Sequence, residues 1–121
     1  MSGKKILFVS RHAPYGSSTA KDALDAILAA SAYEQDLSVL FINDGVFQLL
    51  NTQAAQTISQ KSINAILSAL PLYEINSIYI HTESFTARGL SNEDISQNDY
   101  TFINSQEVNE LMANQHQILS F

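Results

Sequence analysis

Two short apolar runs with a helical segment between them decide the fold of this chain: ILFV at residues 6–9 and LSVLFI at residues 37–42. Both are rich in aliphatic and aromatic residues, which is typical of strands buried on both faces of a sheet. Between them the spacing of apolar residues predicts a helix over residues 20–34, with Ser18 or Thr19 as its cap. A strand, a helix and a strand in this order predict a parallel pair joined by a right-handed crossover.

The same alternation continues to the end of the chain. Further strands are predicted at residues 75–80, 100–103 and 117–121, further helices at 59–70 and 105–115 (Ser105 as cap), helical turns at 46–50 and 85–88, and a polar loop at 51–57. Together these elements predict a single domain over residues 1–121. Its expected fold is α/β, a three-layer sandwich with a mainly parallel sheet of about five strands.

The charge of the chain excludes one class of partner. Twelve acidic and six basic residues give a formal net charge of −6. A protein that binds DNA or RNA directly needs a basic surface to neutralise phosphates, so we expect no direct contact with nucleic acid. No stretch reaches the roughly 18 apolar residues of a membrane span, and the start of the chain lacks the pattern of an export signal. We therefore expect a cytoplasmic protein that does not enter a membrane.

Polar residues are predicted to gather where the parallel strands end. Loops at the carboxyl ends of such strands share one rim, which here receives residues 11–18, 43–46 and 81–89. His12, Asp44 and His81, with Glu83 beside them, are candidates for an acid–base or metal cluster. Their spacing is not specific, and solvated loop residues are the simpler interpretation. Ser84 near His81 has no nucleophile-elbow motif around it and is interpreted as a turn residue.

Other site motifs are absent or incomplete. Residues 16–21 (GSSTAK) resemble a phosphate-binding loop only faintly, because the second glycine is missing and Asp22 follows the lysine. No cysteine occurs in the 121 residues, so the chain forms no disulfide, persulfide or thiolate metal site. We expect no cofactor, no metal and no catalytic residue.

The helix predicted over residues 20–34 is apolar on nearly every side. Burial inside its own domain is one explanation. In a small chain, however, a helix apolar on two sides is most simply covered by another subunit. We therefore expect an obligate oligomer, with an interface that uses Ala23, Leu24, Ile27 and Leu28 of this helix. If the chain is a subunit of a larger complex, we expect Asp44, Val46 and Phe47, in the segment after the second strand, to belong to the same interface.

Several segments carry a family resemblance that spans the chain in order. They are APYG at residues 13–16, DALDAILA at 22–29, DGVFQLL at 44–50, LY at 72–73, RGL at 88–90 and ILSF at 118–121. In these segments the chain resembles the TusC/DsrF family of DsrE-like sulfur-relay proteins, most closely its TusC branch. The resemblance implies a DsrE-like α/β fold.

The resemblance also implies a function. TusC-like chains assemble with TusB-like and TusD-like homologues into a heterohexamer, which passes persulfide sulfur from a TusA-like donor toward a TusE-like acceptor. The sulfur ends in 2-thiouridine at the tRNA wobble position. In TusD-like siblings the carrier cysteine lies after the third strand, where this chain has residues 81–88 and no thiol. The resemblance thus implies a non-catalytic, non-carrier subunit. His12, His81 and Arg88 are the candidate residues on its rim.

Two alternatives stay open at this point. One is a DsrF-like role in bacterial sulfur oxidation, the other branch of the family. The second is a stand-alone small enzyme or ligand-binding protein that uses His12, Asp44 and His81.

Overall fold

The computed structural model describes residues 5–13, 19–33, 36–50, 58–75, 77–95 and 100–121. Its strands are β1 (Lys5–Ser10), β2 (Asp36–Phe41), β3 (Ser77–His81), β4 (Tyr100–Ile103) and β5 (Gln117–Ser120), and its α-helices are α1 (Thr19–Ala30), α2 (Ile58–Ala69), α3 (Thr82–Ala87) and α4 (Ser105–Ala113). Three 3₁₀ segments complete the described elements: η1 (Asn43–Leu49), η3 (Leu70–Tyr73) and η4 (Asn92–Asp94).

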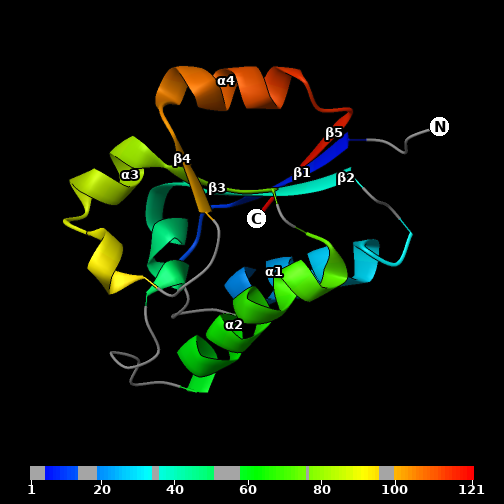
Figure 1. The fold of residues 1–121 in the computed structure, drawn as a ribbon, viewed down its shortest axis with the longest axis horizontal. Helices are drawn as coiled ribbons and strands as arrows, with labels where there is room; N and C mark the ends of the chain where they lie inside the picture. Colours follow the sequence, from blue (N-terminus) through cyan, green and yellow to red (C-terminus); the bar gives the residue numbers. More distant parts are fainter. Residues whose placement is uncertain (1–4, 14–18, 34–35, 51–57, 76, 96–99) are drawn as a thin grey trace.

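The five strands form one sheet in the order β4-β3-β2-β1-β5, and every pairing is parallel. In the register of the sheet, Phe8 of β1 lies opposite Val39 of β2 and Leu119 of β5. Helices α1 and α2 cover one face, and α4 crosses the other (Figure 1). The predicted three-layer α/β fold with a parallel sheet of five strands is confirmed.

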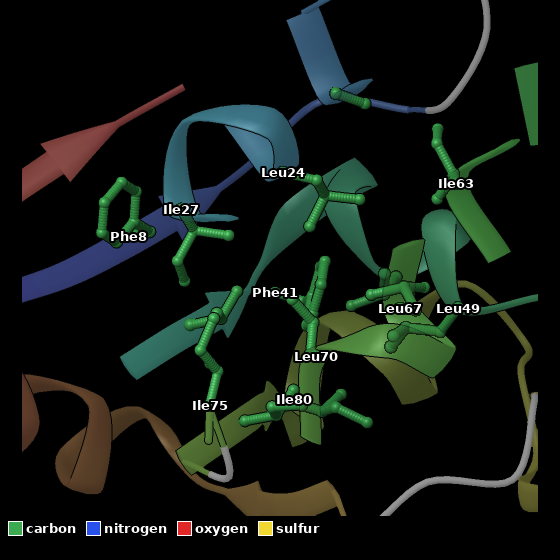
Figure 2. Packing of buried hydrophobic residues seen from close by; sticks show 14 of the residues in the cluster. Phe8, Leu24, Ile27, Phe41, Leu49, Ile63, Leu67, Leu70, Ile75 and Ile80 are labelled. Carbon is green, nitrogen blue, oxygen red and sulfur yellow. The ribbon is translucent and has the colours of Figure 1, made fainter. Parts of the chain in front are cut away.

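Side chains alternate between the two faces of the sheet, which gives two cores. The larger core lies under α1 and α2, where Phe8, Phe41 and Ile80 of the sheet meet Ile27 and Leu67 of the helices (Figure 2). The smaller core lies under α4 and includes Leu7, Val9, Leu40, Ile103 and Val108. Central strands buried on both faces explain why β1 and β2 have nearly uninterrupted apolar sequences.

Some boundaries differ from the sequence prediction for local reasons. Helix α1 ends at Ala30 instead of residue 34, because the N–H groups of Ala32 and Tyr33 bond to carbonyls three residues earlier and form a tighter turn. Strand β3 begins at Ser77 instead of residue 75, because Ile75 still bonds to the carbonyl of Leu70 at the end of η3.

The cap predicted for the last helix is wrong by one residue. Asn104, not Ser105, caps α4: its side chain accepts from the N–H of Glu107 at 2.8 Å, and the Glu107 carboxylate accepts from the N–H of Asn104 at 2.9 Å. This reciprocal capping box leaves the hydroxyl of Ser105 available for other bonds. The cap predicted at Ser18 and the loop predicted at residues 51–57 lie outside the described residues.

The described helices are all too short, or not apolar enough, to cross a lipid bilayer.

Candidate functional site

The carboxyl ends of β1, β2 and β3 meet at one edge of the sheet because the three strands are parallel neighbours. The residues that follow them are 11–13 after β1, η1 after β2 and α3 after β3. This edge is the candidate site, and it holds the described part of the rim predicted from sequence.

The η1 segment is pressed against the end of β1. A Cβ atom on Gly45 would lie 2.0 Å from the backbone carbonyl oxygen of Ser10, so no side chain fits there without a backbone shift. The N–H of Ile42 donates to that same carbonyl at 3.1 Å. Close approach to β1, and not a positive φ angle, is therefore the reason for glycine in the Asp-Gly-Val-Phe segment.

Gln48 fastens η1 to the loop that leaves β1. Its side chain is fully buried, and its Nε2 donates to the Ser10 hydroxyl at 2.6 Å and to the backbone carbonyl of His12 at 2.9 Å. A buried amide that joins two segments far apart in sequence holds the loop after β1 in one position. Gln48 was not among the residues selected from sequence, although it lies within the family-like segment 44–50.

His81, the last residue of β3, is the centre of a hydrogen-bond network. It caps α3, where its Nδ1 accepts from the N–H of Ser84 at 3.3 Å and lies 2.6 Å from the Ser84 hydroxyl. Its Nε2 lies 2.8 Å from the hydroxyl of Ser105 at the start of α4 and 3.4 Å from the Glu83 carboxylate. One imidazole thus joins β3, α3 and α4.

The bonds around His81 define its tautomer. Nδ1 accepts from a backbone N–H, which is always a donor, so the neutral ring carries its proton on Nε2 and donates toward Ser105. Both ring nitrogens are then occupied. A neutral His81 in this state has no free lone pair with which to act as a general base or to bind a metal ion.

The Glu83 carboxylate accepts from the backbone N–H of Ser105 at 3.2 Å. This bond is the largest cause of a pKa for Glu83 below its ordinary value, and the N–H of Glu83 itself adds to the effect. The carboxylate form is favoured because an acceptor-only group satisfies these donors. Glu83 therefore fixes the start of α4 beside His81.

Arg88 and Asp44 form an ion pair across the site. Arg88 Nε donates to Asp44 Oδ1 at 3.0 Å, and Nη1 donates to the backbone carbonyl of Ser84 at 3.1 Å. The pair links the loop after α3 to η1, and the Asp44 side chain remains 59% exposed. A partner that approaches this edge would therefore meet a neutralised guanidinium and an accessible carboxylate.

The residues proposed as an acid–base cluster are in different environments. His12 is exposed, and its backbone carbonyl accepts a hydrogen bond from Gln48. Asp44 pairs with Arg88, and His81 is held by serines. Among the residues that the structure describes, no group of three or more His, Cys, Asp or Glu is placed to hold a metal ion.

The residues proposed for an interface divide into two groups. Ala23, Leu24, Ile27 and Val46 are at most 3% exposed and pack inside the chain, the alternative explanation given for the apolar helix. Leu28 and Phe47 are half-buried and Asp44 is exposed, so these three remain accessible to a partner. The interface itself stays a prediction.

Ser10 and Gln48 were missed by sequence reasoning, Ser105 was interpreted only as a helix cap, and Ser84 was interpreted only as a turn residue. The partners of these side chains lie on other elements: Ser84 bonds to Asn43, 41 residues away, and Ser105 bonds to His81, 24 residues away. Serines at such separations give no periodic signal. Only Gln48 could have been identified from the sequence, because it lies in the family-like segment 44–50.

The chain is similar to known proteins along nearly its whole length. The chain is 34% identical to the intracellular sulfur oxidation protein DsrF of Allochromatium vinosum, over 98% of this chain and 96% of that protein. It is 36% identical to the TusC homologues of Vibrio parahaemolyticus and Vibrio vulnificus, over 97% of this chain and 98% of each relative.

The fold has a counterpart among solved structures. The crystal structure of the ychN protein from E. coli superposes with a TM-score of 0.81 at 22% identity, over 98% of this chain and all of that one. A sequence model of the DsrE/DsrF-like family matches residues 4–121. With relatives of the TusC and DsrF type along its whole length, the chain belongs to the DsrE/DsrF-like family.

Proposed function

We propose that this chain is a non-carrier subunit of a cytoplasmic sulfur-relay complex that passes persulfide sulfur toward 2-thiouridine at the tRNA wobble position. One observation carries the proposal: the 121 residues contain no cysteine, and the site at the end of β3 holds a hydrogen-bonded histidine instead. A persulfide needs a thiol, so any reactive sulfur must lie on another chain. The likeness to TusC homologues supports the choice of this complex.

In this role the site is a rigid surface and not a reaction centre. Ser84, Ser105 and Glu83 occupy the hydrogen-bonding groups of His81, and Asp44 neutralises Arg88. A fully bonded polar network rigidifies the elements that it joins. The expected partners are TusB-like and TusD-like homologues in a heterohexamer, with a TusA-like donor and a TusE-like acceptor reached through the complex and no direct contact with tRNA.

Co-expression tests the proposed assembly. The chain is produced alone and together with TusB-like and TusD-like homologues encoded in the same genome, and the products are compared by size-exclusion chromatography with light scattering. We expect one complex that contains all three chains. We also expect a thiol-alkylating reagent to label the TusD-like chain and leave this one unlabelled. A monodisperse single chain that ignores both homologues would contradict the proposal.

A second candidate function is a DsrF-like role in sulfur oxidation, favoured by the full-length relative from Allochromatium vinosum. Genetic complementation distinguishes the TusC-like role from the DsrF-like role. The chain is expressed in a Vibrio parahaemolyticus strain without its TusC homologue and in an Allochromatium vinosum strain without DsrF. We expect 2-thiouridine, measured in hydrolysed tRNA by mass spectrometry, to be restored in the first strain. Recovery of sulfur oxidation in the second strain alone would support the DsrF-like role.

A further inference from the structure

A groove of about 360 Å³ lies at the β4 margin of the sheet, where α3 and η4 pass beside the strand. Phe85, Leu90 and Phe102 supply its apolar part, and the remaining lining residues are Thr82, Thr86, Ser91 and Asn92. Phe102 is 36% exposed and meets the buried Phe85 edge to face, with ring centroids 5.1 Å apart. The groove therefore offers an accessible aromatic surface that none of the described residues covers.

The strand beside this groove ends the sheet. β4 pairs with β3 on one side, and no strand among the described residues lies beyond it (Figure 1). An edge strand presents backbone N–H and C=O groups that can pair with another extended chain. Because side chains alternate along a strand, Phe102 turns toward the groove while Thr101 and Ile103 turn toward the α4 face.

The chemistry of the groove indicates what occupies it. None of its lining residues is charged, so it has no cationic group with which to neutralise a phosphate or a carboxylate. Glu93 and Asp94 lie directly after lining residue Asn92 and are exposed, whereas Arg88 is turned to Asp44. An apolar pocket with an acidic flank favours an apolar side chain that is followed by a basic one.

We infer that the β4 margin binds an extended segment of another polypeptide, which pairs with β4, places one aromatic or large aliphatic side chain in the groove and sets a basic residue beside Glu93 and Asp94. Main-chain pairing with a side-chain pocket is a known mode of peptide recognition. A second copy of this chain is a poorer occupant. Symmetric pairing of two β4 strands would bring two acidic flanks together on chains that each carry a net charge of −6. This inference does not depend on the role in sulfur relay.

The test titrates the full-length, ¹⁵N-labelled chain with a synthetic acetylated and amidated heptapeptide, Thr-Lys-Val-Phe-Val-Lys-Thr, whose two lysines lie on the same face of an extended strand as the phenylalanine, and follows the amide resonances. We expect shifts confined to residues 82–94 and 100–103. Replacing the central phenylalanine of the peptide by serine should weaken binding about tenfold or more, because a buried aromatic anchor dominates such contacts. A peptide with glutamate in place of both lysines should also bind more weakly.

Matched variants of the chain locate the site. Phe102→Ser should weaken binding about tenfold, whereas Phe102→Leu, which keeps an apolar groove, should stay within about threefold. Thr101→Ser changes the neighbouring residue on the opposite face and should have no effect. Glu93→Gln should weaken binding about two- to fivefold at low salt, and Glu110→Gln on exposed α4 should not.

Three outcomes would overturn the inference. One is the absence of any change in the amide resonances at peptide concentrations up to roughly 2 mM, which would mean a dissociation constant too weak for specific recognition. Another is a set of shifts that maps to a different part of the chain. The third is movement of the same resonances with protein concentration alone, which would assign the groove to a second copy. An amide spectrum dispersed as in the unsubstituted chain shows that each variant is folded.

Discussion

The hydroxyl oxygen of Ser84 accepts a hydrogen bond from the backbone N–H of Asn43 at 2.8 Å. Asn43 lies two residues after the end of β2 and has a φ angle of 55°, a left-handed conformation that asparagine tolerates better than most residues. The same hydroxyl lies 2.6 Å from Nδ1 of His81. One buried serine therefore connects the ends of β2 and β3 and supports the turn that begins η1.

Replacing Ser84 by alanine should lower the free energy of unfolding by about 1–3 kcal/mol, because the N–H of Asn43 and the His81 ring lose the buried hydroxyl as their partner. Urea denaturation followed by circular dichroism measures the change. Thr86→Ala, an exposed change in the same helix, should stay within about 0.5 kcal/mol. Equal effects of the two substitutions would show that the Ser84 bonds contribute no net stability.

Replacing Gly45 or Gly89 by alanine should destabilise the fold, and the physical reason differs between the two positions. Gly45→Ala places a methyl group against the Ser10 carbonyl and should cost about 3 kcal/mol or more, because backbone has to move. At Gly89 nothing lies within 4 Å of the added Cβ, but φ is +73°, so the expected cost is about 1–2 kcal/mol of backbone strain. Thermal or urea denaturation of both variants shows whether Gly45→Ala loses more stability than Gly89→Ala. A larger loss at Gly89 would contradict the close packing of η1 on β1.

The lowered pKa of Glu83 predicts a stability loss in acid. A carboxyl whose pKa is lower in the folded state stabilises the fold above its unfolded value of roughly 4.3, and this contribution disappears as pH falls through the folded value. The Glu83→Gln variant should therefore show a flatter dependence of unfolding free energy on pH below about 4.5 than the unsubstituted chain.

The control for this pH experiment is Glu110→Gln, a change at an exposed carboxylate in the second half of α4. It should leave the acid limb of the stability curve as it is in the unsubstituted chain. A Glu83→Gln variant with an unchanged acid limb would mean that the bond from Ser105 has no net effect on folding.

Phe47 tests the interface proposed with homologous subunits. Its side chain is half-buried beside the exposed Asp44, and the replacement Phe47→Ser should weaken co-purification with TusB-like and TusD-like chains about tenfold. Asn109→Ser, on the exposed side of α4, is the matched surface control. Dissociation constants from interferometry on immobilised chain measure the effect. If Phe47→Ser loses fold stability and not affinity, the interface lies elsewhere.

Strand and helix positions followed from the sequence because burial imposes a period on it. The apolar runs of β1 and β2 indicated strands covered on both faces, and Ile63 and Leu67 indicated the buried side of α2. Boundaries were less accurate. The cap at Asn104 in place of Ser105 depends on which oxygen faces the N–H of Glu107, and adjacent polar residues look alike in a sequence.

The sequence by itself determined the parallel α/β class, the place where the strand ends meet and the absence of any thiol. Element order and apolar period encode the first two, and composition alone states the third. Only the tertiary structure decided which side chains at that edge bond to one another. Ser84 with Asn43 and Ser105 with His81 meet because the sheet register aligns strand ends that are distant along the chain. Contacts of that kind depend on the folded backbone and have no local pattern.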